Sequence, residues 1–312
     1  MVWQASELPQ QTGRTVVITG GNSGIGLEAA NVLAQKGARV IIACRDETHA
    51  AAAASEICKS HARARVETAT LNLASLGSVR ACAEGLARRC ERLDVLINNA
   101  GVMAIPRRDT EDGFETQFGT NHLGHFALTA LLFPLLGSTP GARVVNVASL
   151  AHHFGFINFF NLYGQLFYDP FFAYAQSKLA NLLFTYELDR RCRAAGVDVT
   201  AVACHPGISA TNLGYAGPRM LNWPLGETLI KMFNSIGTQS AADGALPTLY
   251  AGFAPDVKGG DYIGPDGLGE MRGHPRKVQS SFLSRSESVA RQLWGVSEEA
   301  TKIVFGLGGQ QG

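Results

Sequence analysis

Short runs of β-branched and other apolar residues alternate along the first two-thirds of the chain with longer segments of helical character. Such apolar runs are typical of strands buried on both faces of a sheet, and the segments between them are long enough to cross over it as helices. The predicted strands span residues 15–19, 39–43, 65–70, 95–98, 143–147 and 199–203, and the predicted helices span residues 25–36, 47–59, 76–90, 112–136 and 172–194. Pro134 is expected to bend or end the fourth helix. The alternation predicts an α/β fold with a doubly wound parallel sheet between two helix layers, α/β/α.

No Pro/Ser-rich linker and no internal repeat divides the chain, so we expect a single Rossmann-type domain over residues 1–312. We assign a cofactor-binding half to about residues 12–150 and a catalytic and substrate-binding half to about residues 150–300. Ligands of doubly wound sheets bind at the carboxyl ends of the strands. The loops that follow the predicted strands are therefore the first place to look for a site.

The pattern loosens after residue 203. Residues 213–237 mix Gly, Pro, Trp and Met, and they form either a mobile flap over a site or an ordinary surface insertion. A helix near residues 239–251 and a short strand at Tyr262 are expected beyond this segment. Residues 306–312 have the composition of a frayed tail.

The composition is that of a globular protein, with 46% hydrophobic and 17% charged residues. A formal net charge of +1 gives no electrostatic reason to expect a nucleic-acid partner. Six cysteines without a Cys-x-x-Cys spacing are typical of reduced thiols, and the N-terminal residues lack a signal-peptide pattern. The longest apolar stretch, residues 126–136, is too short to span a membrane. We therefore expect a soluble, cytoplasmic protein without a membrane span.

Tyr174 and Lys178 form a Tyr-x-x-x-Lys pair within the fifth predicted helix. Residues four apart lie on one face of a helix, so the two side chains are neighbours. A nearby cation favours the ionised form of a phenol, and we expect Lys178 to lower the pKa of Tyr174. A chance pairing of two amphipathic residues has the same spacing, so the pair needs support from other motifs.

A glycine-rich turn follows the first predicted strand and opens the first helix: Thr19, Gly20, Gly21, Asn22, Ser23, Gly24, Ile25 and Gly26. Glycines there permit a tight turn and let phosphate oxygens approach the backbone, while the helix N-terminus offers free N–H groups to an anion. The first two matched glycines are separated by three residues, in contrast to the single residue of the common dinucleotide fingerprint. This arrangement predicts a nucleotide-phosphate site.

These motifs occur in a fixed order together with four others, and the set covers about residues 12–211. The additional members are Asn98-Asn99-Ala100-Gly101, Asn121, Ser149 and Pro206-Gly207. The set resembles that of the short-chain dehydrogenase/reductase family. Within the family the chain is similar to the retinol dehydrogenase-like branch, judged by residues 43–46, 121–126 and 177–181.

The resemblance implies a nicotinamide cofactor, and the end of the second strand decides which one. The position of the ribose-binding acid of NAD enzymes falls on neutral Cys44, and Arg45 follows it. A guanidinium pairs well with the 2′-phosphate of NADP(H). Asp46 could instead bind the ribose, but it stands where the next helix begins and is equally suited to an N-cap. We interpret the site as one for NADP(H).

Further cofactor contacts are implied by the resemblance. Asn72 stands where relatives carry an Asp that meets the adenine, followed by Leu73, and Asn offers both a donor and an acceptor for this contact. Asn99, Ala100 and Gly101 are expected to support the adenosine side of the site. Pro206 and Gly207, with Thr211, resemble the segment that binds the nicotinamide carboxamide; a generic turn is the alternative.

The catalytic residues implied by the resemblance are Asn121, Ser149, Tyr174 and Lys178. Tyr174 is the general acid/base, Lys178 also holds the nicotinamide ribose, and Ser149 hydrogen-bonds the substrate oxygen. Asn121 kinks the fourth helix and positions a water that relays protons toward Lys178. Without this set, Ser149 would be interpreted as a strand-end turn residue and Asn121 as a helix-capping amide.

Ten of the 26 aromatic residues of the chain lie between Phe154 and Tyr174. Because this segment joins Ser149 to Tyr174, it borders the predicted site. The aromatic side chains either form an apolar substrate pocket, or pack an insertion onto the core, or make a subunit interface. All three interpretations remain open at this point.

The sequence thus predicts an NADP(H)-dependent oxidoreductase that interconverts a small hydrophobic alcohol and its aldehyde or ketone. A homo-oligomer is possible by resemblance. The alternatives are a protochlorophyllide-reductase-like reductase of a porphyrin double bond and a non-catalytic NADP-binding module. The complete catalytic set argues against both. His122 and His125 have no third ligand at metal-site spacing, so no metal is predicted.

Overall fold

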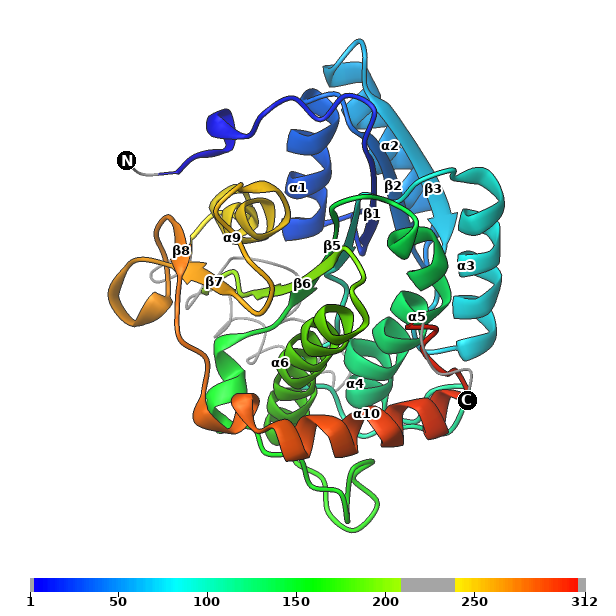
Figure 1. Ribbon diagram of the computed structural model, residues 1–312, viewed down its shortest axis with the longest axis vertical. Coiled ribbons are helices and arrows are strands. Elements are labelled where there is room, and N and C mark those ends of the chain that lie inside the picture. Colours follow the sequence, from blue (N-terminus) through cyan, green and yellow to red (C-terminus); the bar gives the residue numbers. More distant parts are fainter. Residues whose placement is uncertain (1–2, 209–238, 308–312) are drawn as a thin grey trace.

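One eight-stranded sheet forms the middle layer of the computed structural model, which describes residues 3–208 and 239–307 (Figure 1). The strands are β1 (Thr15–Thr19), β2 (Arg39–Cys44), β3 (Arg65–Thr70), β4 (Val95–Asn98), β5 (Ala142–Val147), β6 (Val199–Cys204), β7 (Tyr262–Pro265) and β8 (Pro275–Lys277). Their order is β3-β2-β1-β4-β5-β6-β7-β8. Only β8 pairs antiparallel, with β7, among these strands. The strand order reverses direction between β1 and β4, and this is where a doubly wound sheet opens a crevice.

Helices cover both faces of the sheet (Figure 1). The main helices are α1 (Gly24–Gln35), α2 (Glu47–Ser60), α3 (Leu76–Arg89), α4 (Thr116–Phe118), α5 (Gly124–Gly137), α6 (Pro170–Ala195), α9 (Ala241–Phe253) and α10 (Glu287–Thr301). Alternate strand residues divide between the layers: Val17 packs with α3, α5 and α6, whereas Val16 and Ile18 pack with α1, α2 and α9. The three-layer α/β/α architecture predicted from the sequence is confirmed.

The helix predicted over residues 112–136 differs most from the structure. It begins at Thr116 and contains a π-helical turn, Gly119–Leu123, between α4 and α5. Glu115 is the N-cap of α4, and its carboxylate accepts the N–H groups of Gln117 and Phe118. Asp112 lies outside the helix, and its carboxylate accepts the N–H of Leu76 at the start of α3 at 2.8 Å. Pro134 lies in the last turn of α5, which ends at Gly137. The helix therefore begins at a side-chain cap rather than where the apolar pattern begins.

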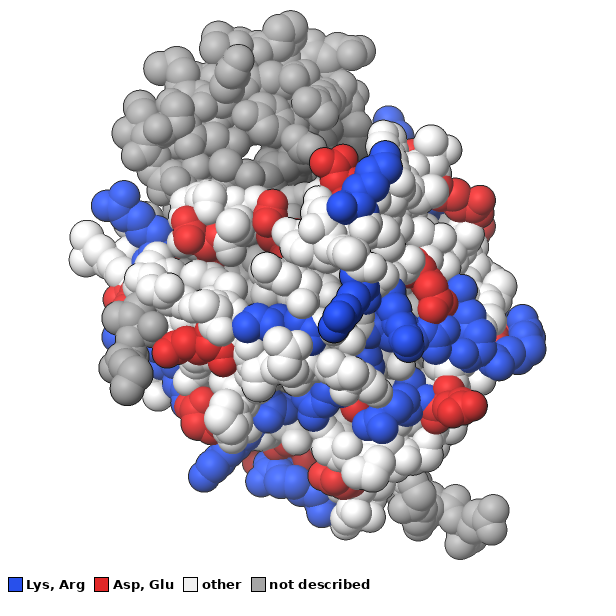
Figure 2. Space-filling model, turned by 90° about the horizontal axis from the view of Figure 1, so that it is seen from above, with Lys and Arg blue, Asp and Glu red and all other residues white. Residues whose placement is uncertain are grey.

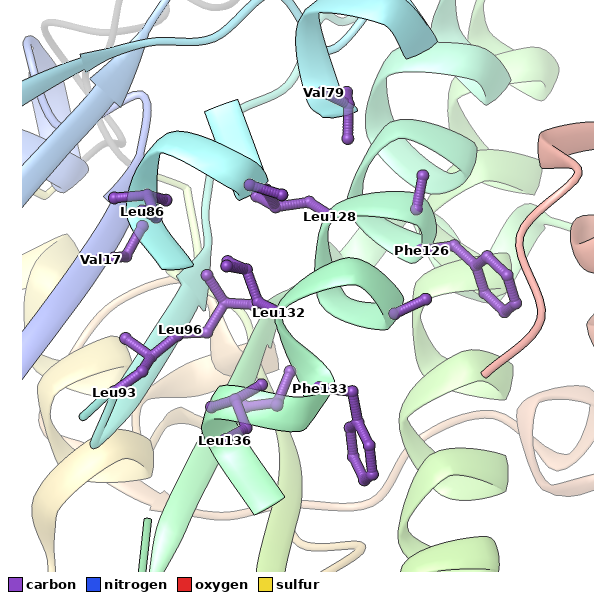
Figure 3. Close-up of a cluster of buried hydrophobic side chains, with 14 of the residues drawn as sticks. Val17, Val79, Leu86, Leu93, Leu96, Phe126, Leu128, Leu132, Phe133 and Leu136 are labelled. Carbon is purple, nitrogen blue, oxygen red and sulfur yellow. The ribbon is translucent and has the colours of Figure 1, made fainter. Parts of the chain in front are cut away.

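Helix α10 was not predicted, and it closes the outer side of the helical layer that contains α6. Its Trp294 lies 5.2 Å from the Phe126 ring, 5.8 Å from the Phe184 ring and 4.7 Å from the Phe305 ring, centroid to centroid. The guanidinium of Arg191 lies 4.3 Å from the centroid of the same indole. Figure 3 shows Phe126 pointing from α5 toward the C-terminal ribbon, while Leu128 and Leu132 face the interior. The aromatic cluster ties the C-terminal segment to α5 and α6.

Charged side chains are mixed on the surface. Figure 2 shows Lys and Arg in a broken band across one face, with Asp and Glu among and beside them. None of the helices within residues 3–208 and 239–307 combines the length and apolar character that crossing a membrane requires. The predicted flap at residues 213–237 lies outside the described residues, as does the tail beyond residue 307.

We predict that Trp294→Ala lowers the free energy of unfolding by about 3–5 kcal/mol, because it leaves a cavity among the aromatic rings. Urea denaturation measures this change. Val304→Ala is the matched control, since Val304 lies close in sequence but is 80% exposed. Equal unfolding midpoints for the two variants would show that α10 adds nothing to the stability of the core.

Candidate active site

The carboxyl ends of β1, β4, β5 and β6 bring the predicted motifs together. The glycine-rich turn follows β1, Asn99 follows β4, Ser149 follows β5, and Pro206 follows β6. Parallel strands end at the same edge of a sheet, so these four loops lie around one crevice. Helix α6 crosses beside it and carries Tyr174 and Lys178.

The turn after β1 is shaped for a phosphate group. Gly20 and Gly24 have φ of +66° and +53°, a conformation that favours glycine. A Cβ on Gly26 would lie 2.5 Å from the Gly20 carbonyl oxygen and 2.6 Å from Asn99 Nδ2. Ser23 is the N-cap of α1 without a side-chain capping bond, so the first N–H groups of α1 remain open to an anion. Asn22 and Ile25 are half-buried in the turn.

Thr19 joins this turn to the loop after β4. Its buried Oγ1 accepts the backbone N–H groups of Asn99 at 2.9 Å and Ala100 at 3.0 Å. The side-chain amide of Asn99 donates to the Thr19 carbonyl oxygen at 2.8 Å. These bonds fix the loop after β4 to the end of β1. Gly101 follows directly, and a Cβ there would lie 3.1 Å from Asn121 Oδ1 and 3.6 Å from Lys178 Nζ.

Arg45 and Asp46 are neighbours at the end of β2, but their side chains differ in the contacts that they make. Arg45 is exposed, and within the described residues it makes no hydrogen bond or ion pair. Asp46 is the N-cap of α2: its carboxylate accepts the N–H of His49 at 2.9 Å and contacts His49 Nδ1 at 2.7 Å. These bonds hold the pKa of Asp46 below its usual value. The Asp46 carboxylate therefore caps α2, whereas the exposed Arg45 guanidinium can bind a ligand.

Asn72 and Leu73 follow β3. The Asn72 amide donates to Glu111 at 3.2 Å and accepts the N–H of Ala74 at 3.1 Å, which leaves its second N–H and its second lone pair for an adenine. Leu73 is buried, and its carbonyl oxygen would lie 2.5 Å from a Cβ on Gly124, so only glycine fits at position 124. The predicted adenine side is therefore formed by a half-buried amide and by backbone.

Asn121 lies in the π-helical turn, as expected of a residue that kinks this helix. The side chain is fully buried. Its amide donates to the Val102 carbonyl oxygen and to Ser177 Oγ, both at 2.9 Å, and its Oδ1 accepts the Val102 N–H at 2.8 Å. Ser177 lies beside Lys178 on α6, so Asn121 ties the loop after β4 to the catalytic helix.

Ser149, Tyr174 and Lys178 meet at the end of β5. Tyr174 is only 4% exposed, and its hydroxyl lies close enough to the Ser149 side chain for that side chain to influence its pKa. Lys178 Nζ donates to the Val147 carbonyl oxygen at 2.9 Å and lies 5.7 Å from the centroid of the Tyr174 ring. The phenol, hydroxyl and ammonium predicted from the sequence thus share one buried corner of the crevice.

The expected lowering of the Tyr174 pKa is not present, and this corrects the sequence analysis. Burial raises the pKa of Tyr174 to about 12, although the nearby Ser149 side chain opposes this rise. Burial also lowers the pKa of Lys178 to about 8. The ammonium bonds to a carbonyl oxygen rather than to the phenol, so desolvation outweighs attraction between the two groups. The site as built holds Tyr174 as a neutral phenol, which is a proton donor.

Gly207 has φ of +65°, and a Cβ there would collide with the Met271 carbonyl oxygen. Its N–H donates to His205 Nδ1 at 3.2 Å, and His205 Nε2 contacts Glu270 at 2.9 Å. Pro206 is thus followed by a turn that the segment around Met271 supports. Thr211, the third predicted residue here, lies outside the described residues. The His205–Glu270 link was not predicted, because 65 residues separate its members.

Most aromatic side chains of residues 154–174 face outward rather than packing on the core. Phe160 is 95% exposed, and Phe154, Phe156, Phe167, Phe171 and Phe172 are also exposed. A cavity of about 240 Å³ lies within this segment, and its lining includes Phe156, Phe167, Phe172 and Gln176 but none of the four predicted catalytic residues. On α6, Phe172 and Gln176 lie on a different face from Tyr174.

His122 and His125 are both buried, but they bind different partners. His122 Nε2 contacts Ser297 Oγ of α10 at 2.8 Å, whereas His125 Nε2 contacts Thr19 Oγ1 at 2.9 Å. Within residues 3–208 and 239–307, no three His, Cys, Asp or Glu side chains are grouped so that they could hold a metal ion.

A phosphate-binding turn beside a Ser-Tyr-Lys corner on a doubly wound sheet defines an oxidoreductase of the nicotinamide-dependent class. A family model described as short chain dehydrogenase matches residues 14–217. The chain belongs to the short-chain dehydrogenase/reductase family and is retinol dehydrogenase-like in sequence.

Two curated relatives illustrate this similarity. Retinol dehydrogenase 14 of Mus musculus is 43% identical over 303 residues, covering 94% of this chain and 87% of the relative. Retinol dehydrogenase 12 of Homo sapiens is 42% identical over 297 residues, covering 94% and 88%.

Solved structures share the fold. A crystal structure of an uncharacterised protein from Mycobacterium Paratuberculosis matches with a TM-score of 0.81 and 43% identity, covering 98% of this chain and 99% of that one. The NADP complex of RhlG from Pseudomonas aeruginosa matches with a TM-score of 0.63 and 24% identity, covering 81% of this chain and 94% of that one. The second likeness shows the fold alone.

We predict that Gly26→Ala weakens binding of a nicotinamide dinucleotide by at least about tenfold, since its Cβ would press on the Gly20 carbonyl and the Asn99 amide. Titration of cofactor fluorescence measures the dissociation constant. Gly85→Ala in α3 is the control, because a Cβ there meets nothing within 4 Å. If Gly26→Ala binds the cofactor as tightly as Gly85→Ala does, the turn after β1 is not the phosphate site.

Proposed function

We propose that the protein is an NADP(H)-dependent oxidoreductase that interconverts a hydrophobic alcohol and its aldehyde or ketone. The observation that carries this proposal is the buried corner formed by Ser149, Tyr174 and Lys178 at the carboxyl edge of the sheet. The retinol dehydrogenase names of the relatives support a retinol-like alcohol as the substrate class.

The residues around the crevice fit a nicotinamide cofactor. The Gly26 position leaves room only for a hydrogen, the N-terminus of α1 has free N–H groups, and Arg45 is exposed at the end of β2. When bound, the nicotinamide ring supplies or accepts the hydride. The chain itself must then orient the substrate oxygen and move one proton.

Ser149 and Tyr174 perform that proton step. Ser149 Oγ is placed to hydrogen-bond the substrate oxygen beside the phenol, since the Ser149 side chain lies close enough to the Tyr174 hydroxyl to influence its pKa. For carbonyl reduction, the neutral phenol donates its proton to the oxygen on which negative charge develops. For alcohol oxidation, the same proton returns to Tyr174.

Lys178 is suited to stabilise the phenolate that results. A pKa of about 8 leaves most of its side chain protonated at pH 7. Its contact with Val147 leaves N–H groups of the ammonium for further partners. A negative charge forming on Tyr174 is attracted to this buried cation, which favours proton release at the moment of reaction.

Arg45 supports NADP(H) over NAD(H). The guanidinium is free of protein partners within the described residues, and no competing carboxylate is open beside it, since Asp46 caps α2. A 2′-phosphate would form charge-assisted bonds with such a group, whereas a 2′-hydroxyl gains little from it.

We predict that Arg45→Ala weakens NADPH binding by about tenfold and leaves NADH binding nearly unchanged, because one charge-assisted bond is lost. Dissociation constants for both cofactors measure the ratio. Arg63→Ala is the control. Arg63 is also exposed, but it precedes β3 and so lies at the amino ends of the parallel strands, away from the crevice at their carboxyl ends. A ratio that is the same in the wild type and in Arg45→Ala would remove Arg45 from the 2′-phosphate site.

Tyr174→Phe is predicted to lower kcat by about 10²–10⁴-fold, the usual contribution of a general acid/base, with cofactor binding retained. The assay follows NADPH absorbance with a panel of apolar aldehydes and ketones, and NADP with apolar alcohols. Tyr186→Phe is the control on the same helix, because its hydroxyl bonds to Ser280 instead.

Two results would count against the proposal. Full turnover by Tyr174→Phe would show that another group moves the proton. Tight NADPH binding without turnover of any compound in the panel would favour a cofactor-binding module.

A further inference from the structure

Two buried histidines bind the backbone of two predicted catalytic residues. His125 Nδ1 lies 2.9 Å from the Asn121 carbonyl oxygen, and His152 Nδ1 lies 2.7 Å from the Ser149 carbonyl oxygen. His125 is 2% exposed and His152 is fully buried. A carbonyl oxygen only accepts hydrogen bonds, so both Nδ1 atoms carry a hydrogen.

The partners of the second ring nitrogen show that each imidazole is neutral. The backbone N–H of Ser281 donates to His152 Nε2 at 3.1 Å, which is possible only if this nitrogen is unprotonated. His125 Nε2 lies 2.9 Å from Thr19 Oγ1. That hydroxyl already accepts two backbone N–H groups, which occupy both lone pairs of its oxygen. It therefore donates its hydrogen to His125, at a shorter distance than the 3.4 Å to its other acceptor, the Ile97 carbonyl oxygen. Burial lowers the pKa of both histidines to about 4, in agreement with this assignment.

Each histidine therefore connects a catalytic residue to a distant element. His125 connects Asn121 in the π-helical turn to Thr19, the residue that joins the phosphate turn to the loop after β4. His152 connects Ser149 at the end of β5 to Ser281 in the C-terminal part of the chain. The Ser149 side chain must point at Tyr174 to hold a substrate oxygen, and its backbone orientation determines where it points.

We propose that His125 and His152, each as the neutral Nδ1–H form, are positioning residues that orient Asn121 and Ser149 through their backbone carbonyls. This inference rests on the proposed function, because it concerns the same reaction. Neither imidazole touches the reacting atoms; His125 acts through Asn121, and His152 acts through Ser149.

Asparagine and glutamine variants separate the two hydrogen bonds of each ring. The amide nitrogen of Asn lies near the place of Nδ1, so His152→Asn can keep the bond to the Ser149 carbonyl. The longer Gln places its amide near Nε2, so His152→Gln keeps the Ser281 contact and loses the carbonyl bond. His125→Asn and His125→Gln form the equivalent pair.

We expect His152→Gln to lower kcat about tenfold, the factor for one neutral hydrogen bond, and His152→Asn to retain kcat within about threefold. Neither change should alter the dissociation constant of the cofactor. His125→Gln should likewise lower kcat, whereas His125→Asn, which loses the Thr19 contact, should weaken cofactor binding by about tenfold.

His122→Asn and His122→Gln are the matched controls. His122 is buried in the same helical segment as His125, yet it contacts Ser297 of α10 and no site residue. Its variants should lose stability while kcat and cofactor affinity stay at the wild-type values. If the Asn and Gln variants at position 152 lose kcat equally, or if the loss follows the melting temperature across all three positions, the histidines are structural only.

The protonation state is measured directly in the wild-type protein by ¹⁵N NMR of labelled histidine. Two neutral imidazoles with the hydrogen on Nδ1 are expected at pH 7, and they should stay neutral down to about pH 5. The groups that influence their titration are Lys178 and His122 for His125, and His153, His205 and Glu270 for His152. Hydrogens found on Nε2 instead would overturn the proposal. This measurement needs no substrate, so it separates failure of the positioning role from failure of the proposed reaction.

Discussion

The pairing of β1 with β2 on one side and β4 on the other is the constraint on which the site depends. β1 is the central strand at which the order reverses, so the chain must leave its carboxyl end through a turn that opens the crevice. Thr19, the last residue of β1, is fully buried, and its hydroxyl satisfies two N–H groups of the loop after β4. The phosphate turn and the adjoining loop are therefore held by the same strand end rather than by separate contacts.

Burial is what gives the catalytic groups their character. Tyr174 and Lys178 are both buried beside the apolar layers that stabilise the sheet. Burial raises the pKa of Tyr174, so the phenol is neutral, and it lowers the pKa of Lys178. Burial of the phenol and the ammonium reduces the rearrangement of solvent that proton transfer between them requires. The energy needed to bury Lys178 is supplied by the packing of α6, of which it forms part.

The central architecture could be predicted from sequence because buried parallel strands are continuous apolar runs. All strands predicted before residue 204 agree with the structure within a residue at each end. The doubly wound sheet and the shared face of Tyr174 and Lys178 follow from that pattern and from helical spacing, whereas the strand order comes from the structure. The beginning of the helix predicted over residues 112–136 was wrong, because the helix starts after the Glu115 cap and Asp112 instead contacts Leu76, 36 residues away in sequence.

Within the site, too, the features that could not be predicted from the sequence depend on contacts between distant residues. The prediction that Lys178 lowers the pKa of Tyr174 considered only the i, i+4 spacing of the two residues. The hydrogen bond of the ammonium to Val147 and the burial of both groups depend on the tertiary structure. The bonds of His125 and His152 are partly local, since each ring reaches a carbonyl three or four residues earlier. Their second partners, Thr19 and Ser281, lie 106 and 129 residues away. Each histidine is hydrogen-bonded at both ring nitrogens, so it holds the local carbonyl in a fixed position relative to the distant element. The sequence shows the local carbonyl, but only the three-dimensional structure shows the distant partner.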